Sequence, residues 1–431
     1  MFYNRDVECA DRETITRMQL ESLRKTVARV AAVPFYRERL EQAGVTADGI
    51  KGLSDLERIP FTTKEDMRAH SPYGLLAVDM RDIVRIHASS GTTGTATVVG
   101  YTKGDLDNWA TCIARIVAMA GGSDADIAQI SFGYGLFTGA FGLHYGLEKL
   151  GASVIPMSTG NTKRQIQIMQ EFGTTLLVST PSYALYLGET AREMGIDPKK
   201  DLKVRLGVLG AEGHTEEMRK ELERLFDMTV TENYGLSEVM GPGVSGECYL
   251  HTGMHINEDH FILEIIDPDT GQVLPEGAEG EVVITTITKE GQPLLRYRTR
   301  DISSITYAPC ACGRTSARMA KVKGRSDDML VIRGVNVFPS QIERAVLSVP
   351  GAGPGYEIIV SKEGHMDQLE VLVEVSDPGM LTVYGDLERI SREVRLALRE
   401  EILIDCKVSL VNPMSLKRFE GKAKRVTDLR D

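Results

Sequence analysis

An alternation of short apolar runs with amphipathic stretches, between about residues 110 and 235, constrains the fold of this chain most strongly. The apolar runs are rich in β-branched residues, and helical patterns separate them near 162–172, 182–194 and 215–226. This order predicts a parallel sheet with helices on both faces. The predicted strands are Ala152–Met157, Thr175–Ser179, Val204–Leu209 and Met228–Thr231.

Ligands of such sheets bind at the carboxyl ends of the strands. Two loops follow predicted strands and carry polar residues, at 210–214 and 232–238. We therefore expect both loops to contribute to a binding site.

The flanking segments predict the rest of an α/β protein. Residues 12–45 have helical spacing, with Pro34 stopping the helix. Residues 261–308 are β-rich and antiparallel in pattern, with strands expected at Gly280–Ile287 and Leu294–Tyr297. From about residue 328 strands and helices alternate again, with helices expected at 339–347 and 385–402.

These patterns predict a large amino-terminal domain and a small α+β carboxy-terminal domain. The polar, glycine-started stretch 324–328 separates them, so the expected domains are 1–326 and 327–431. A chain of 431 residues is too long for one ordinary core, which agrees with this division.

Composition and charge exclude several classes of protein. Acidic residues outnumber basic ones by 61 to 50, giving a net charge of −11. Bulk attraction to nucleic acid or to an anionic membrane is therefore not expected, and any phosphate site must be local. The sequence shows no secretory signal and no apolar run that could cross a bilayer, so we expect a cytoplasmic protein. Its 6 cysteines are too sparse for a disulfide framework.

The stretch from Ser89 to Thr97 is rich in hydroxyl residues and contains two glycines. Glycine lets the backbone approach a ligand closely, and Ser and Thr add donors beside exposed N–H groups. Converging donors of this kind suit a phosphate. No Lys follows Gly94, so this is not the phosphate loop of nucleotide triphosphatases. The alternative is a polar surface turn between strands.

Other motifs favour the functional interpretation of that loop. They are Ser-Ser-Gly-Thr-Thr-Gly at 89–94, Tyr-Gly-Leu-Ser-Glu at 234–238, Tyr-Arg-Thr-Arg-Asp at 297–301, Gly-Arg-Ser-Asp-Asp at 324–328 and Val-Asn-Val-Phe-Pro-Ser-Gln-Ile-Glu at 335–343. In these motifs and their order, the chain resembles the adenylate-forming superfamily and, within it, the phenylacetate–coenzyme A ligase family. The resemblance covers essentially the whole length.

The resemblance implies a two-step ligase. A carboxylate attacks the α-phosphate of ATP to give an acyl-adenylate and pyrophosphate, and the thiol of coenzyme A then displaces AMP. Such a reaction needs neutralised charge and aligned atoms rather than a protein nucleophile. The residues implied to bind ATP are Ser89, Ser90, Gly91, Thr92, Thr93, Gly94, Ala211, Glu212, Glu232, Tyr234, Gly235, Asp301 and Arg325.

Individual roles follow from the same resemblance. The loop 89–94 would hold the β- and γ-phosphates, and Tyr234 would stack on adenine in a slot lined by Ala211 and Glu212. Asp301 would accept both ribose hydroxyls. Glu238 would hold Mg²⁺, which prefers oxygen ligands.

The implied catalytic lysine is Lys422, which would bridge the acid and the α-phosphate. Lys417 and Lys424 are rivals, but Lys422 alone follows the matching glycine. The resemblance also implies that the small carboxy-terminal domain is mobile, with Asp327 as the hinge between the two domains.

The stretch Phe132–Gly142 is the expected acyl pocket. Its glycines clear space while Tyr134, Phe137 and Phe141 supply rings, as a flat aromatic acid requires. The resemblance adds Gly213 and His214, at a position where relatives often carry Pro-Trp. Phenylacetate or a close relative is the expected acid. The alternative is a glycine-rich packing turn.

A structural Zn²⁺ site is also expected. Cys310 and Cys312 offer two thiolates on one turn, and Cys248 and His255 could complete a tetrahedral set, as in relatives that carry the same Cys-x-Cys-Gly-Arg sequence. His251 is an alternative to His255.

Two other functions remain open at this point. The chain could adenylate an aryl acid for transfer to a carrier protein, or it could be a degenerate regulatory relative that only binds nucleotide. The expected partners are the aryl acid, ATP and coenzyme A, in a homodimer without nucleic acid or membrane.

Overall fold

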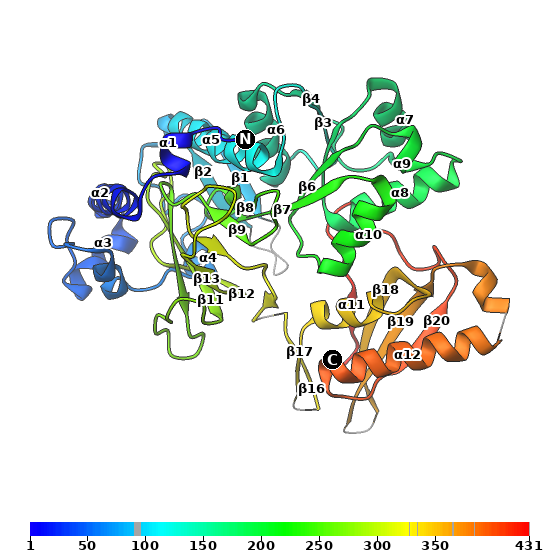
Figure 1. Ribbon diagram of the computed structural model, residues 1–431. Coiled ribbons are helices and arrows are strands. Elements are labelled where there is room, and N and C mark those ends of the chain that lie inside the picture. Colours follow the sequence, from blue (N-terminus) through cyan, green and yellow to red (C-terminus); the bar gives the residue numbers. More distant parts are fainter. Residues whose placement is uncertain (90–95, 327, 334, 364–365, 383, 431) are drawn as a thin grey trace. The chain divides into compact units, whose positions relative to one another are not determined.

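The computed structural model describes residues 1–89, 96–326, 328–333, 335–363, 366–382 and 384–430 (Figure 1). The chain divides into two compact units. Unit 1 consists of Met1–Ser179, Leu202–Ala211 and Thr229–Lys321, and unit 2 of Thr180–Asp201, Glu212–Met228 and Val322–Asp431. Unit 2 thus includes three helices from the middle of the sequence. The domain boundary at 326/327 stays a prediction.

Unit 1 is built on a mixed nine-stranded sheet with the order β13-β14-β9-β8-β7-β6-β5-β3-β4. The run from β4 to β7 is parallel, which confirms the prediction from the alternating pattern. Beyond β7 the sheet continues antiparallel. Its strands are β3 (Ile127–Ile130), β4 (Ser153–Ile155), β5 (Leu176–Ser179), β6 (Leu206–Gly210), β7 (Thr229–Leu236), β8 (Gly241–Glu247), β9 (Met254–Ile256), β13 (Ile305–Thr306) and β14 (Arg318–Met319).

Helices of unit 1 cover this sheet from two sides. The connection from β3 to β4 runs outward and the one from β4 to β5 runs back across β3. Right-handed crossovers therefore place α6 (Gly139–Leu150) and α7 (Thr162–Phe172) on opposite faces (Figure 1). Helix α5 (Lys103–Ala120) packs beside α6 and against β8.

The amino-terminal helices differ from the prediction. Residues 12–45 form two helices, α2 (Arg12–Val30) and α3 (Pro34–Ala43), instead of one helix stopped at Pro34. Pro34 occupies the first position of α3, where its missing N–H costs nothing and its fixed φ suits the helix. The neighbouring short elements are α1 (Arg5–Glu8), η1 (Leu53–Arg58), α4 (Lys64–Ala69), η2 (Met80–Asp82) and the hairpin of β1 (Arg85–Ser89) with β2 (Thr97–Tyr101).

The β-rich stretch of unit 1 forms an antiparallel sheet of β10 (Phe261–Ile266), β11 (Gly280–Thr286) and β12 (Tyr297–Ser303). The prediction for β11 is confirmed within one residue. The strand expected at Leu294–Tyr297 is wrong, because β12 begins only at Tyr297. The pairing of β12 with β11 shifts register between Glu281 and Val283, an irregularity that alternating hydrophobicity does not reveal.

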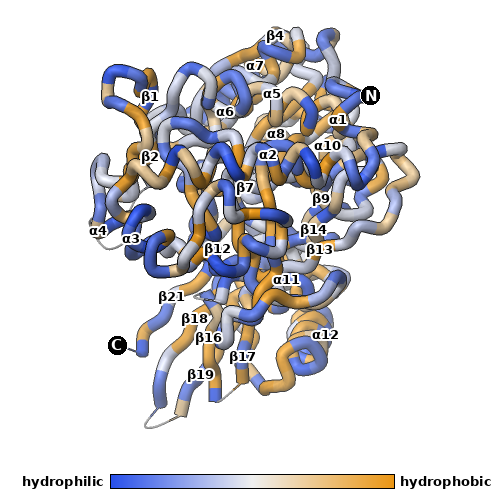
Figure 2. The backbone as a smooth tube through the Cα atoms, turned by 90° about the vertical axis from the view of Figure 1, so that its left-hand side faces the viewer, coloured by the Kyte–Doolittle hydropathy of each residue, from blue (hydrophilic) through white to orange (hydrophobic). Residues whose placement is uncertain are grey.

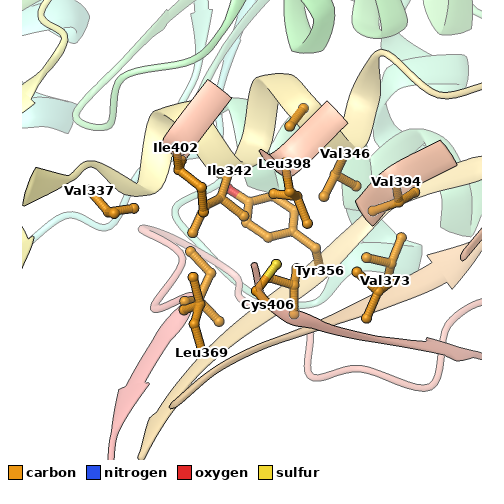
Figure 3. Close-up of a cluster of buried hydrophobic side chains, with 14 of the residues drawn as sticks. Val337, Ile342, Val346, Tyr356, Leu369, Val373, Val394, Leu398, Ile402 and Cys406 are labelled. Atoms are coloured by element: carbon orange, nitrogen blue, oxygen red, sulfur yellow. The ribbon is translucent and has the colours of Figure 1, made fainter. Parts of the chain in front are cut away.

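Unit 2 is an α+β unit around a four-stranded sheet of order β20-β19-β18-β21. Val346 of helix α11 (Pro339–Leu347) and Leu398 of helix α12 (Tyr384–Ile402) pack in the same core as Tyr356 of the sheet (Figure 3). In Figure 2, α12 carries both hydrophilic (blue) and hydrophobic (orange) residues along its length, as expected for a helix with one buried face. The strands and the other elements are β15 (Gly324–Arg325), β16 (Leu330–Ile332), β17 (Val335–Val337), β18 (Ala352–Glu363), β19 (Met366–Val375), η3 (Pro378–Thr382), β20 (Lys407–Val411), β21 (Val426–Asp428), α8 (Pro181–Glu193), α9 (Pro198–Asp201) and α10 (Glu216–Phe226).

Among the described residues, no helix is both long and apolar enough to span a membrane.

Candidate active site and metal centre

Two predicted ATP-binding residues meet in unit 1. The hydroxyl of Tyr234, near the end of β7, donates to Oδ2 of Asp301 at 2.6 Å, although the residues are 67 apart in sequence. Asp301 is buried and Tyr234 is partly exposed. A ring and an acceptor-only carboxylate are thus fixed side by side, which suits a base and its ribose hydroxyls.

An irregular turn of backbone aims Asp301. Arg300 has a left-handed φ of 69°, and its N–H donates to the buried carboxylate of Glu281 at 3.1 Å. The same carboxylate pairs with Arg298, while the N–H of Asp301 donates to Thr299 Oγ1 at 3.0 Å. This departure from regular pairing within β12 re-aims a side chain, as bulges beside binding sites commonly do.

The turn after β7 carries Glu238, the predicted Mg²⁺ ligand. Its side chain is buried, and Oε1 lies 3.0 Å from the ammonium of Lys64, the first residue of α4. A buried carboxylate oxygen is a hard ligand that suits Mg²⁺, so the donor fits the ion. Lys64 is not among the residues predicted from the sequence, because it belongs to none of the motifs.

The backbone of this turn is held by two buried side chains. Tyr101 donates through its hydroxyl to the carbonyl of Met240 at 3.0 Å, and Lys289 donates to the carbonyl of Val239 at 2.7 Å. Burial lowers the pKa of Lys289 to about 7, against the opposing attraction of Asp105 and Glu238. The position of Glu238 is therefore set by a rigid frame.

The predicted slot residues of unit 1 lie beside β6 and β7. Ala211 follows β6 with a left-handed φ of 69°, unusual for a residue with a side chain. Glu232 is buried within β7, and Lys321 approaches it at 3.8 Å. Gly235 lies so close to β8 that a Cβ would clash with the carbonyl of Gly241, which explains glycine there.

An aromatic cluster forms at the predicted acyl pocket. The ring of Phe141 lies 5.2 Å from Tyr134 and 6.3 Å from Tyr145, centroid to centroid. His87 adds a ring at 5.7 Å, and the guanidinium of Arg85 lies 5.2 Å above Phe141. Burial raises the pKa of Tyr134, and it lowers that of His87, so His87 stays neutral.

The sequence also predicts Phe137 in this pocket. Its ring does not join the Phe141 cluster. The centroid of the Phe137 ring lies 6.4 Å from that of Phe132, and 43% of the residue is exposed. Sequence reasoning missed Arg85, His87 and Tyr145, although His87 stands two residues before Ser89. The sequence feature that could have identified His87 is its position on the strand directly before the hydroxyl-rich stretch.

Five predicted site residues in the described part of the chain lie in unit 2. Lys422 is exposed, Glu212 is half-buried, and Gly213 and His214 lie between Glu212 and α10. The N–H of Ala423, directly after Lys422, donates to Glu212 at 2.9 Å. Arg325, on β15, lies 3.7 Å from Asp328.

The remaining predicted residues lie outside the described part of the chain. They are Ser90, Gly91, Thr92, Thr93, Gly94 and the hinge residue Asp327. Ser89 is described and ends β1.

A compact cluster of thiols and imidazole forms the candidate metal centre. The ligand atoms of Cys248, His255, Cys310 and Cys312 all lie within 4.8 Å of one another, and all four residues are buried. The sulfurs of Cys248 and Cys310 are 4.0 Å apart, and Cys312 Sγ lies 3.4 Å from His255 Nε2. A tetrahedral Zn²⁺ site needs about 3.8 Å between sulfurs and about 3.5 Å between sulfur and nitrogen.

The neighbours of the cluster agree with a metal-binding imidazole. Nδ1 of His255 lies 3.0 Å from Ser316 Oγ, which leaves Nε2 toward the thiols. Burial, aided by Arg314 and Arg318, lowers the pKa of His255 to about 3, so the ring is neutral. His251, the alternative ligand, instead lies 3.6 Å from the carboxylate of Glu247. The geometry therefore favours His255.

A separate cavity of about 350 Å³ lies between α2, η1 and the β10 sheet. Its lining includes Arg12 and the buried carboxylates of Glu258 and Glu264, each of which is paired with an arginine. None of the predicted site residues lines it.

Comparison with known proteins gives consistent matches. The family model described as AMP-binding enzyme matches residues 15–288, and that of the AMP-binding enzyme C-terminal domain matches residues 334–430. A phenylacetate–coenzyme A ligase from Thermus thermophilus is 47% identical, with all of both chains covered. That of Escherichia coli is 45% identical, over 99% of this chain and 97% of its own.

A solved structure of a 2-hydroxyisobutyryl-CoA ligase is similar along the whole chain. It was determined in the postadenylation state in complex with an acyl-AMP ligand, R3-HIB-AMP. The TM-score is 0.93 at 27% identity, with 100% of this chain and 92% of the other covered.

Proposed function

The chain belongs to the phenylacetate–coenzyme A ligase family of AMP-binding enzymes, which makes it an AMP-forming acid–CoA ligase, and from this premise we propose its acid and the roles of its residues. The acid is an aryl-acetic acid, phenylacetate or a close relative. The observation that carries the assignment of residues is the contact of Tyr234 with Asp301 at 2.6 Å, because it joins the two motifs proposed to hold adenosine.

In the first step an oxygen of the acid's carboxylate attacks the α-phosphorus of ATP. The bond to the bridging oxygen breaks, and pyrophosphate leaves with that electron pair. Lys422 reduces the repulsion between the carboxylate and the phosphate, since its ammonium is a compact positive charge. Asp301 accepts from the ribose hydroxyls, and Tyr234 stacks on the base, which aligns the α-phosphate.

Glu238 is the residue proposed to hold Mg²⁺, which would neutralise phosphate charge when bound. Lys64 now neutralises this carboxylate at 3.0 Å. We propose that Lys64 gives up the pairing when the ion binds. The frame of Tyr101 and Lys289 keeps the turn in place during that exchange.

In the second step the thiolate of coenzyme A attacks the acyl carbonyl, and AMP leaves. The aryl group rests against Phe141 and Tyr134, whose edge-to-face contact supports a preformed aromatic wall. Gly213 and His214 are proposed as further pocket residues, and Phe137, being exposed, as a residue of its rim.

The direct experiment mixes the purified protein with ATP, Mg²⁺, coenzyme A and a panel of arylacetates, and measures AMP, pyrophosphate and thioester. Stoichiometric AMP and arylacetyl-CoA support the proposal. Adenylate that forms but is not transferred to coenzyme A would favour loading of a carrier protein. Nucleotide binding without pyrophosphate release would favour a regulatory relative.

We further propose that Cys248, His255, Cys310 and Cys312 bind a structural Zn²⁺. Three thiolates and one imidazole are a closed tetrahedral set with no position for substrate, so the ion would supply stability rather than chemistry. The sulfur–sulfur distance of 4.0 Å between Cys248 and Cys310 supports the site. A homodimer and a cytoplasmic location complete the proposal, and sedimentation and cell fractionation test them.

A further inference from the structure

The two peptide groups that flank Lys422 are both hydrogen-bonded within unit 2. Thr180 Oγ1 donates to the carbonyl of Gly421 at 3.1 Å, and the N–H of Ala423 donates to Glu212 Oε2 at 2.9 Å. The side chain of Lys422 is exposed, and within the described part of the chain its ammonium makes no hydrogen bond or ion pair. The backbone is therefore fixed while the charge stays available.

Glu212 connects this segment to the start of α8. Its second oxygen, Oε1, accepts from the N–H of Ser182 at 2.7 Å, in the first turn of the helix. A carboxylate is favoured there because the N–H groups of a first turn lack partners within the helix. Burial raises the pKa of Glu212, while the hydrogen bonds from Ser182 and Ala423 lower it.

Two arginines hold the ends of the same segment, whereas the peptide groups beside Lys422 are hydrogen-bonded to Glu212 and Thr180. Arg418 donates to Glu189 at 3.0 Å and to Glu374 at 2.7 Å. Arg425 lies 4.2 Å above the ring of Tyr356 and donates to its carbonyl. These contacts fix where residues 418–425 run; they do not set the direction in which Lys422 leaves the backbone.

We infer that the Glu212 carboxylate is a positioning residue for Lys422: through Ala423 it fixes the peptide plane from which the lysine projects, for the adenylation step. The inference rests on the proposed role of Lys422 and deepens it. It also changes the role expected of Glu212 from the sequence. Each carboxylate oxygen already accepts a backbone N–H, one from Ser182 and one from Ala423, so the side chain joins two segments of unit 2.

Glu212→Gln tests the inference, because an amide has one acceptor oxygen and would turn its NH₂ toward one of the two N–H groups. Adenylation, measured as exchange of pyrophosphate into ATP, should fall about ten- to a hundred-fold in kcat. The KM for ATP should stay within about two-fold. Thioester formation from supplied phenylacetyl-adenylate and coenzyme A should stay within about two-fold as well. Equal loss in both half-reactions, or a raised KM for ATP alone, would overturn the inference.

A double variant shows whether Glu212 acts through the lysine. On a Lys422→Ala background, Glu212→Gln should cause no further loss of adenylation, whereas independent roles would add. Glu343→Gln is the matched control. Glu343 is a buried carboxylate of unit 2 that accepts a backbone N–H from Thr215 at 3.1 Å and the hydroxyl of Tyr356 at 2.8 Å, but it makes no hydrogen bond to residues 421–423 in the described part of the chain. It should leave the ratio of the half-reactions unchanged.

Amide hydrogen exchange tests whether Glu212 holds the segment around Ala423, without any measurement of enzyme activity. In the protein free of substrates, peptides covering 419–425 should exchange faster in Glu212→Gln than in the unsubstituted protein, and not in Glu343→Gln. Unchanged exchange would overturn the inference even if the ligase assignment holds. If no arylacetate is ligated by the unsubstituted protein, the proposed function fails, while exchange still decides whether Glu212 holds the segment.

Discussion

The turn at 237–240 and the segment at 418–425 both have a tied backbone, yet their functional side chains are in opposite states. Glu238 is buried and paired with Lys64 at 3.0 Å. Lys422 is exposed, with no partner for its ammonium among the described residues. The functional carboxylate of unit 1 is thus already paired with a cation, whereas the functional ammonium of unit 2 is exposed to solvent.

This difference has a physical reason. A buried charge without a partner costs several kcal/mol, so a carboxylate kept inside unit 1 needs a counter-ion before any ligand arrives. An exposed ammonium is solvated and needs none. The residues of unit 1 must therefore exchange partners on binding, whereas Lys422 needs only the correct direction.

The largest effect should come from Lys422→Ala. Adenylation should fall by about 10²- to 10³-fold, because charge at the α-phosphate is no longer neutralised. Conversion of supplied acyl-adenylate to thioester should change little. Lys424→Ala, two residues along on the same exposed segment, is the control and should retain adenylation; if Lys424→Ala or Lys417→Ala shows the larger loss, the lysine is misassigned.

A slightly smaller effect is expected from breaking the Glu238 pair from either side. Glu238→Gln should lower kcat for adenylation about 100-fold, since an amide binds Mg²⁺ poorly. Lys64→Met should instead shift the Mg²⁺ dependence to lower concentrations, because no ammonium competes for the carboxylate. Titrations of Mg²⁺ at saturating ATP measure both. An unchanged Mg²⁺ dependence in Lys64→Met would show that the pair does not compete with the ion.

Local pattern is sufficient to predict some of the elements. It predicts helix α11 at 339–347, the observed bounds, since a proline at the first position and a regular apolar spacing mark the helix clearly. Pro34 is misinterpreted because proline stops one helix and starts another equally well. The start of β12 is missed because Arg296, directly before the strand, has a left-handed φ of 46° and is held by Glu264, 32 residues earlier.

Only those site residues that belong to a motif could be predicted from the sequence. Tyr234, Glu238 and Asp301 stand in motifs, so their residue types and their order are informative from the amino-acid sequence alone. Lys64 has no motif, and its role depends on a pairing across 174 residues, the difference between positions 238 and 64. The tie of Glu212 to Ala423, 211 residues apart, is likewise invisible to spacing along the chain.

Removal of the metal should affect stability more than chemistry. The sequence paired Cys248 and His255 with the Cys-x-Cys turn, and the pairing of His255 with Arg318 across β9 and β14 brings that turn close. Cys312→Ser should lose about one equivalent of zinc and lower Tm by roughly 5–10 °C. The kcat at 25 °C should change less than two-fold. Cys406→Ser, a buried thiol of unit 2, should retain the zinc.

Cys312→Ser should loosen unit 1 and leave the Lys422 segment of unit 2 unchanged. Arg314, in contact with Cys312, pairs with Glu8 at 2.7 Å, so the cluster anchors the amino-terminal residues of unit 1. Early proteolysis in Cys312→Ser should therefore fall within residues 1–12 and spare 418–425. Zinc-free protein with unchanged Tm and the same cleavage pattern would contradict a structural metal.

The smallest effect is expected in the proposed acyl pocket of unit 1, where aromatic rings contact one another and no ion pair is broken. Phe141 meets Tyr134, Tyr145 and His87, so its removal leaves a wall of other rings in place. Phe141→Ala should raise the KM for phenylacetate about ten-fold and leave that for ATP within two-fold, because one aromatic contact contributes about 0.5–1.5 kcal/mol beyond its area. Phe172→Ala, an exposed ring at the end of α7, should change neither KM. An equal rise for both substrates would make Phe141 a packing residue, and the preformed wall would then lie elsewhere in unit 1.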